Sequence, residues 1–97
     1  MENIQFQWDN NKANINLKKH GVSFEEAKSV FWDENARVIH DPEHSKNEDR
    51  FLILGFSEAL RILIVCHCCH EDEKIIRVIS ARKATSKEIK QYREFLL

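Results

Sequence analysis

Three apolar segments joined by very short connections constrain the fold of this 97-residue chain more than any other feature. They run from Arg50 to Ser57, from Arg61 to His67 or slightly beyond, and from Lys74 to Ser80. Because the connections "EAL" and "HEDE" are too short to cross a sheet, the segments predict an antiparallel meander. The runs "FLILGF" and "ILIVC" are almost continuously apolar, so we expect central strands that helices cover on at least one face.

The N-terminal part predicts a strand followed by two helices. "IQFQW" (Ile4 to Trp8) alternates apolar and polar residues, as a half-buried strand does. A helix from Asn10 to His20 ends at Gly21, which favours the left-handed conformation found after helix C-termini. "SFEE" (Ser23 to Glu26) is a capping box that opens the second helix, and the short link between the helices indicates a helical hairpin.

The rest of the chain predicts a further strand, a loop and a final helix. "ARVIH" (Ala36 to His40) is the strand, and the polar loop from Asp41 to Asp49 opens with Asp-Pro, a turn signal. Thr85 or Ser86 caps the final helix. Its expected apolar stripe is Ile89, Tyr92 and Leu96. The order of elements predicts one α+β domain over residues 1–97, with helices packed against a mostly antiparallel sheet.

Charge is unevenly distributed along the chain, although the net charge is only −1. Residues 22–49 carry eight acids and three bases, a net charge of −5, whereas residues 74–97 carry seven bases and two acids, a net charge of +5. One segment suits a basic partner and the other an anionic partner, unless both are solvated surfaces. The chain has no run of about eighteen apolar residues and no signal-peptide pattern, so we expect a cytoplasmic protein without a membrane span.

The segment "CHCCH" (Cys66 to His70) contains all three cysteines, Cys66, Cys68 and Cys69. Neighbouring residues of a strand point to opposite faces, so this cluster is a poor disulfide framework. A metal-binding module is one alternative, but zinc sites usually need a second ligand pair elsewhere in the chain. We expect reduced cysteines, no metal ion and no cofactor.

Four motifs, in order along nearly the whole chain, resemble the BrnT family of ribonuclease toxins from bacterial type II toxin–antitoxin systems. They are W-D-x-x-K from Trp8, K-H-G-V-S-F-E-E-A from Lys19, D-R-F followed by G-x-S from Asp49, and I-S-A-R-K-A from Ile79. "CHCCH" departs from the family, in which apolar and then polar residues are usual at this place. Roles for His67 and His70 therefore stay open.

The resemblance implies a RelE-like fold and cleavage of RNA. It also implies a BrnA-like antitoxin with a ribbon-helix-helix fold, which neutralises the toxin in a heterotetramer and brings the complex to operator DNA. The main hypothesis is a metal-independent endoribonuclease that cleaves RNA, chiefly messenger RNA, and so inhibits translation and growth. The alternative is a catalytically inactive homologue that binds the antitoxin and regulates the operon.

Cleavage through the 2′-OH needs a base, an acid and cations beside the charged phosphorane. Arginine suits the last task because its planar fork pairs with phosphate oxygens. The expected catalytic residues are Arg82, Arg50, His20 and Lys12. His20 titrates near neutrality, although a histidine at a helix C-terminus also stabilises the helix dipole. Lys12 is suited to contact a phosphate, and Glu48 and Asp49 are alternative bases or solvated charges.

The expected RNA-binding residues are Arg61, Arg77, Lys83 and Trp8. Trp8 is suited to stack on a base, although a tryptophan before a helix N-cap more often packs on the core. The stretch "IRVISARKATSKEI" indicates a strand that ends near Ser80, followed by a cationic turn with Arg82 and Lys83. In an antiparallel meander this position lies nearer to Arg61 than to Arg50, so strand order alone does not predict one arginine cluster. Sheet twist and the first helix remain able to bring the arginines to one concave face.

Overall fold

Ten elements make up the part of the chain that the computed structural model describes, which is residues 4–45, 48–70 and 74–96. In chain order they are β1 (Gln5–Gln7), α1 (Asn10–His20), α2 (Phe24–Ser29), the 3-10 turn η1 (Val30–Trp32), β2 (Arg37–His40), the 3-10 turn η2 (Pro42–His44), β3 (Arg50–Phe56), β4 (Ile62–His70), β5 (Ile75–Lys83) and α3 (Ser86–Phe95). This order confirms the predicted α+β fold. Among these residues no helix is long and apolar enough to cross a bilayer.

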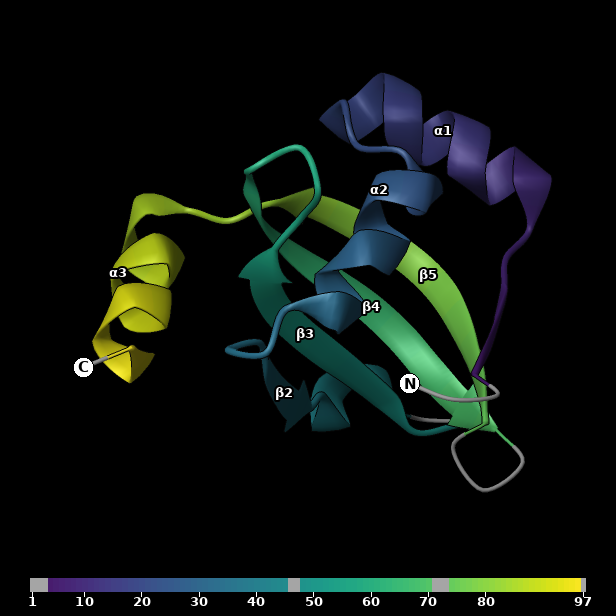
Figure 1. Cartoon of the computed structure of the whole chain (residues 1–97). Coiled ribbons are helices and arrows are strands. Elements are labelled where there is room, and N and C mark those ends of the chain that lie inside the picture. Colours follow the sequence, from purple (N-terminus) through teal and green to yellow (C-terminus); the bar gives the residue numbers. More distant parts are fainter. Residues whose placement is uncertain (1–3, 46–47, 71–73, 97) are drawn as a thin grey trace.

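One five-stranded sheet organises the molecule, with the strand order β1-β5-β4-β3-β2. The pairs from β2 to β5 are antiparallel, which confirms the predicted meander. β1 joins the other edge parallel to β5, so the sheet is mixed but mostly antiparallel. Figure 1 shows α2 in front of the sheet, α1 beside it, and α3 apart from both beyond the end of β5.

Capping interactions fix the helix ends. Gly21 has a φ of 69°, a left-handed conformation that glycine adopts at little cost, and it closes the last turn of α1. Ser23 Oγ accepts the N–H of Glu26 at 3.0 Å, which confirms Ser23 as the N-cap of α2. The Glu26 carboxylate instead accepts hydrogen bonds from Ser57 and Arg61, so the second half of the predicted capping box is wrong.

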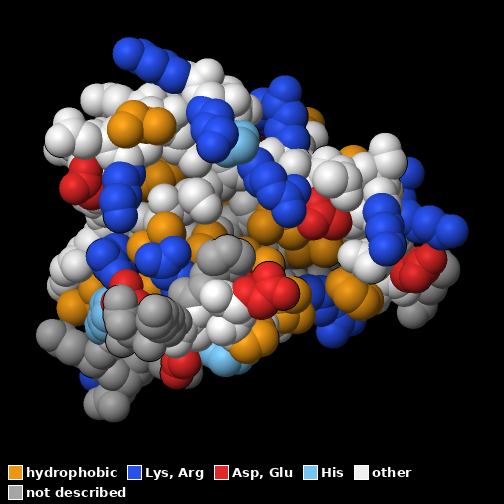
Figure 2. Space-filling view, turned by 180° about the vertical axis from the view of Figure 1, so that it is seen from behind, with side chains coloured by type: hydrophobic (Ala, Val, Ile, Leu, Met, Phe, Trp, Pro, Cys, Tyr) orange, Lys and Arg blue, Asp and Glu red, His pale blue; other side chains and the backbone are white. Residues whose placement is uncertain are grey.

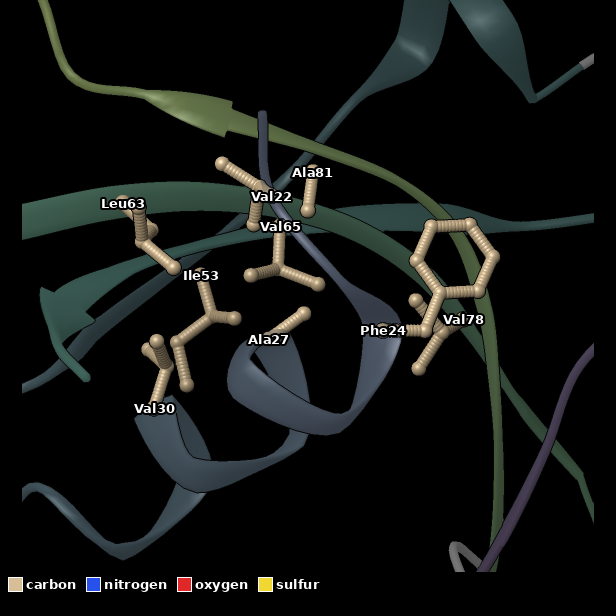
Figure 3. Packing of buried hydrophobic residues seen from close by; sticks show 9 residues of the cluster. All are labelled: Val22, Phe24, Ala27, Val30, Ile53, Leu63, Val65, Val78 and Ala81. Carbon is tan, nitrogen blue, oxygen red and sulfur yellow. The ribbon is translucent and has the colours of Figure 1, made fainter. Parts of the chain in front are cut away.

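The main core lies between α2 and the sheet. Figure 3 shows its nine buried residues, Val22, Phe24, Ala27, Val30, Ile53, Leu63, Val65, Val78 and Ala81. α1 is attached to β5 by a polar contact. The buried Asn16 amide donates to the carbonyls of Val22 and Ala81 at 2.9 Å each, and its oxygen accepts the N–H of Ala81 at 3.0 Å. These bonds satisfy buried polar groups and fix where α1 ends relative to β5.

α3 packs on the other face of the sheet, where its Tyr92 forms a second cluster with Leu54, Ile62 and Ile64. Thr85 is the N-cap, and Glu88 completes a full capping box with it. Burial, together with a hydrogen bond from the Tyr92 hydroxyl to an aspartate, raises the pKa of Tyr92 to about 12. Leu96 lies after the end of α3 and is 49% exposed, so its predicted place in the apolar stripe is wrong.

Candidate active site

A cavity of ≈360 Å³ opens on the sheet face opposite to α2, and we call it the sheet groove. It brings together Arg82, Arg50 and His20, three of the four expected catalytic residues. Its lining consists of His20, Asp41, Arg50, Leu52, Ile64, Cys66, Ile79, Ser80, Ala81 and Arg82. Figure 2 views the molecule from behind relative to Figure 1 and shows Lys and Arg side chains spread over this face around apolar ones.

Cross-strand pairing explains why the arginines share this face. Arg50 and Arg77 both pair with Cys68 on β4. Arg82 pairs with Ile64, four residues earlier on that strand. A register shift leaves Ile79 as one extra residue in β5. Arg77 and Arg82 are five residues apart in sequence, so in a regular strand their side chains would point to opposite faces. The bulge brings both side chains to the same face. Four residues along a strand span roughly 13 Å, a distance that two arginine side chains directed toward each other can bridge.

β5 is longer than the sequence indicated. It continues through Lys83, and the next residue, Ala84, still donates its N–H to the carbonyl of Ile62 at 2.9 Å. The predicted cationic turn after Ser80 is therefore wrong, because Arg82 lies within a paired strand. A rigid strand supports this side chain better than a turn does.

Arg82 is held by Glu88 in a forked ion pair. Its Nη1 and Nη2 atoms donate to the two carboxylate oxygens at 2.8 and 3.0 Å. This bond from Arg82 lowers the pKa of Glu88 to about 2, and the same contact raises the pKa of Arg82. Glu88 also accepts the N–H of Thr85 at 2.8 Å, so the pair is tied to the first turn of α3. A guanidinium with its orientation fixed in this way loses little entropy when it binds a phosphate.

His20 reaches the groove because α1 ends there. It is the last residue of α1, and its side chain is partly buried in the wall of the groove. Asn16 lies one turn earlier on the same side of the helix and is bonded to Ala81, the neighbour of Arg82. The hydrogen bonds between Asn16 and Ala81 therefore set the position of His20 relative to Arg82.

Asp41 is a groove residue that the sequence analysis did not select. It precedes Pro42 between β2 and η2, and its N–H donates to the carbonyl of Arg50 at 2.8 Å. Asp41 and Cys66 both line the groove, where burial raises the pKa of the Cys66 thiol, Arg50 opposes this rise, and the Asp41 carboxylate adds to it. The available signal was the Asp-Pro pair, which indicated a turn but not the direction of the aspartate side chain.

Arg61 and Lys83 lie on the side of the sheet that faces α2. Arg61 is at the same end of the sheet as Arg82, as strand order predicted, but on the other face. Its Nε donates to the Glu26 carboxylate at 2.9 Å, and its Nη2 donates to the carbonyl of Gly21 at 3.1 Å. The hydrogen bond from Arg61 lowers the pKa of Glu26, and the charge of Lys83 contributes. Arg61 therefore joins β4 to α2, and neither cation lines the groove.

Arg77 extends the cationic row beside Arg50. It forms an ion pair with Glu48 and its Nη2 lies 3.9 Å from the Cys68 sulfur. Its Nε is buried and has no hydrogen-bond partner among the described residues. A guanidinium near a core is costly without a counter-charge, and Glu48 supplies it here. Glu48 is therefore an ion-pair partner of Arg77, while Asp49 lies 3.3 Å from His40.

Trp8 and Lys12 are not among the groove-lining residues. Trp8 packs edge-on against Phe24, with ring centroids 6.0 Å apart, beside the main core. Lys12 is exposed in the first turn of α1, where its N–H donates to the N-cap Asp9 at 3.0 Å. A catalytic role for Lys12 and an RNA contact by Trp8 stay predictions.

The "CHCCH" segment forms the end of β4. His67 is 2% exposed and packs between Phe31 and Phe51, and burial lowers its pKa, so it is a neutral core residue. His70 lies 3.7 Å from Glu48. The three cysteines are free thiols. Within residues 4–45, 48–70 and 74–96, no group of three or more His, Cys, Asp or Glu side chains is arranged to hold a metal ion.

Comparison with known proteins identifies the family. Residues 8–88 match the family described as the ribonuclease toxin BrnT of type II toxin–antitoxin systems. The fold is similar to that of the 1.1 Å crystal structure of the Brucella abortus ribonuclease toxin BrnT, with a TM-score of 0.65 and 24% identity over 86% of this chain and 99% of that chain. A search of curated proteins found no match. The chain belongs to the BrnT family of type II ribonuclease toxins, which implies ribonuclease activity and a cognate antitoxin.

Proposed function

We propose that the sheet groove is the active site of an endoribonuclease that cleaves RNA by attack of the 2′-OH on the adjacent phosphate. The observation that carries this proposal is the convergence of Arg50, Arg82 and His20 from three separate elements on one cavity. Two guanidinium groups supply the positive charge that a phosphorane needs. Because the protein itself supplies these cations, the reaction proceeds without a metal ion.

Asp41 and His20 act as the base and the acid. The ionised carboxylate of Asp41 accepts the proton of the 2′-OH, and the protonated imidazole of His20 donates a proton to the leaving 5′-oxygen. The O2′–P bond forms while the P–O5′ bond breaks, which leaves a 2′,3′-cyclic phosphate and a 5′-hydroxyl. Asp41 is favoured over Glu48 and Asp49 because only Asp41 lines the groove.

The substrate is single-stranded RNA read with little sequence preference. The groove lining includes the aliphatic residues Leu52, Ile64 and Ile79, which are suited to contact the face of a base but not to read its edges. Arg77 continues the cationic row and is placed to bind a neighbouring phosphate. Cleavage of messenger RNA in the cytoplasm then inhibits translation and growth.

The cognate antitoxin is BrnA-like, with a ribbon-helix-helix fold that binds operator DNA, and it neutralises the toxin in a heterotetramer. The separation of acidic and basic segments along the chain supports two partners of opposite charge. The second candidate function is an inactive homologue that binds the antitoxin and regulates the operon. The observation in its favour is the ion pair with Glu88, which neutralises Arg82.

A matched pair of RNA oligonucleotides tests the mechanism. The purified protein is incubated with single-stranded RNA and EDTA, and the cut site is mapped. We expect 2′,3′-cyclic phosphate ends, and no cleavage of an oligonucleotide with a single 2′-deoxynucleotide at that site. Cleavage of the deoxy substrate at the same bond contradicts attack by the 2′-OH. If the wild-type protein does not cut RNA and does not arrest bacterial growth when it is produced without antitoxin, it is the inactive homologue.

A further inference from the structure

A second cavity, of ≈540 Å³, lies between α2, η1 and the end of β3, and we call it the α2 groove. Its lining consists of Glu25, Lys28, Ser29, Trp32, Asp33, Phe56, Ser57 and Glu58. α2 covers the sheet face opposite to the sheet groove, as the position of α2 in front of the sheet in Figure 1 shows. The α2 groove shares no lining residue with the proposed active site.

Trp32 gives the α2 groove an exposed apolar surface, and Phe56, whose ring lies on the α3 face of the sheet, borders the groove at the end of β3. Trp32 is 54% exposed and Phe56 is 40% exposed. Both rings are held by neighbours: Trp32 stacks on Phe6 with centroids 5.6 Å apart, and Phe56 packs edge-on against Tyr92 at 5.7 Å. Rings restrained before binding lose little entropy in a complex, and tryptophan is among the residues that most often dominate interface energies.

The charges around these rings are mostly negative. Three carboxylates and one ammonium line the groove. Asp33 is held by donors from Tyr92 and from two backbone N–H groups, so it stays in place as a fixed charge. The side chains of Glu25 and Glu58 belong to exposed residues at the rim. A ligand with apolar side chains flanked by Lys or Arg complements this surface, whereas RNA does not.

We propose that the α2 groove is the docking site for a segment of the cognate antitoxin in which apolar side chains are flanked by basic ones. This inference rests on the assignment of the chain to the toxins of type II systems, which implies an antitoxin, and on no part of the cleavage mechanism. Trp32 contacts the apolar side chains, and Glu25 and Glu58 pair with the basic ones. This acidic surface lies largely within residues 22–49, the segment with a net charge of −5.

The test measures the affinity of the full-length toxin for the antitoxin encoded by the neighbouring reading frame, by calorimetry at low and high salt. Trp32→Ala is expected to weaken binding about 30-fold or more. Glu58→Lys is expected to weaken it about 10-fold and to reduce its salt dependence. Glu58 is exposed in a turn, so this variant keeps the test valid if Trp32→Ala unfolds. Glu94→Lys, the same charge change on the exposed side of α3, is the control with wild-type affinity.

Wild-type affinity in both groove variants overturns the proposal. So does a toxin homodimer that Trp32→Ala dissociates while antitoxin affinity is unchanged, because the occupant is then a second copy. RNA cleavage by the free groove variants is expected to equal that of the wild type. If the wild type does not cleave RNA but the groove variants lose antitoxin binding, the cleavage mechanism fails and the docking site stands.

Discussion

Replacing Glu88 by glutamine is expected to lower the free energy of unfolding by about 1–2 kcal/mol near neutral pH. In the folded protein the hydrogen bond from Arg82 holds the pKa of Glu88 at about 2, compared with its ordinary value of 4.5. That difference corresponds to roughly 3 kcal/mol. The Arg82 side chain is 41% exposed and that of Glu88 is 23% exposed, so solvent screening reduces the contribution to the smaller range.

The pH dependence of this effect has a definite sign. Because the pKa of Glu88 is lower in the folded state, its contribution is fully present above the ordinary value of 4.5 and is lost as the pH falls through about 2. Glutamine at this position still closes the capping box with Thr85. The substitution therefore removes the ion pair with Arg82 and keeps the helix cap.

Urea unfolding followed by circular dichroism, from about pH 2 to about pH 7, measures the effect in both proteins. We expect a difference in unfolding free energy that is largest above about pH 5 and shrinks toward zero near pH 2. High salt is expected to reduce the difference at neutral pH. Equal stability at neutral pH, or a difference that does not change with pH, refutes the reasoning about the forked ion pair.

Three further predictions concern the sheet groove, the ion pair between Arg61 and Glu26, and the packing at Gly55. Asp41→Asn and His20→Gln are each expected to slow RNA cleavage about 100- to 1,000-fold and to remove one limb of the pH–rate profile, whereas wild-type rates contradict the acid–base assignment. Arg61→Ala leaves the buried Glu26 carboxylate without its ion-pair partner and is expected to cost about 2–3 kcal/mol in urea unfolding; unchanged stability shows that the pair is not structural. Gly55→Ala places its Cβ 3.0 Å from two neighbouring side-chain atoms and is expected to cost about 1–3 kcal/mol, and a wild-type melting temperature argues against this crowding.

Sequence patterns predicted the elements well because those patterns are local. The meander follows from short connections, and the caps at Ser23 and Thr85 follow from side chains that bond three residues ahead. The family motifs and the chemistry of arginine selected Arg82, Arg50 and His20, which the structure brings to one groove.

Several of the errors concern which partner or which face a side chain meets. The bulge at Ile79 changes the alternation of β5, so the direction of Arg77 relative to Arg82 does not follow from counting residues. Arg61 was placed correctly along the strands, but its contact with Glu26 depends on where α2 packs. Asp41 lies in a connection without periodicity, so no local pattern indicates that it lines the groove.

Cleavage of purified RNA in EDTA by the wild type, Arg82→Ala and Arg93→Ala tests the central claim most directly. Arg93 is exposed on α3 and does not line the sheet groove, so it is a matched control for the loss of one arginine. The account predicts a loss of about 100- to 1,000-fold in Arg82→Ala, with its fold intact by circular dichroism, and wild-type cleavage in Arg93→Ala. Wild-type cleavage by Arg82→Ala contradicts the assignment of the sheet groove as the active site.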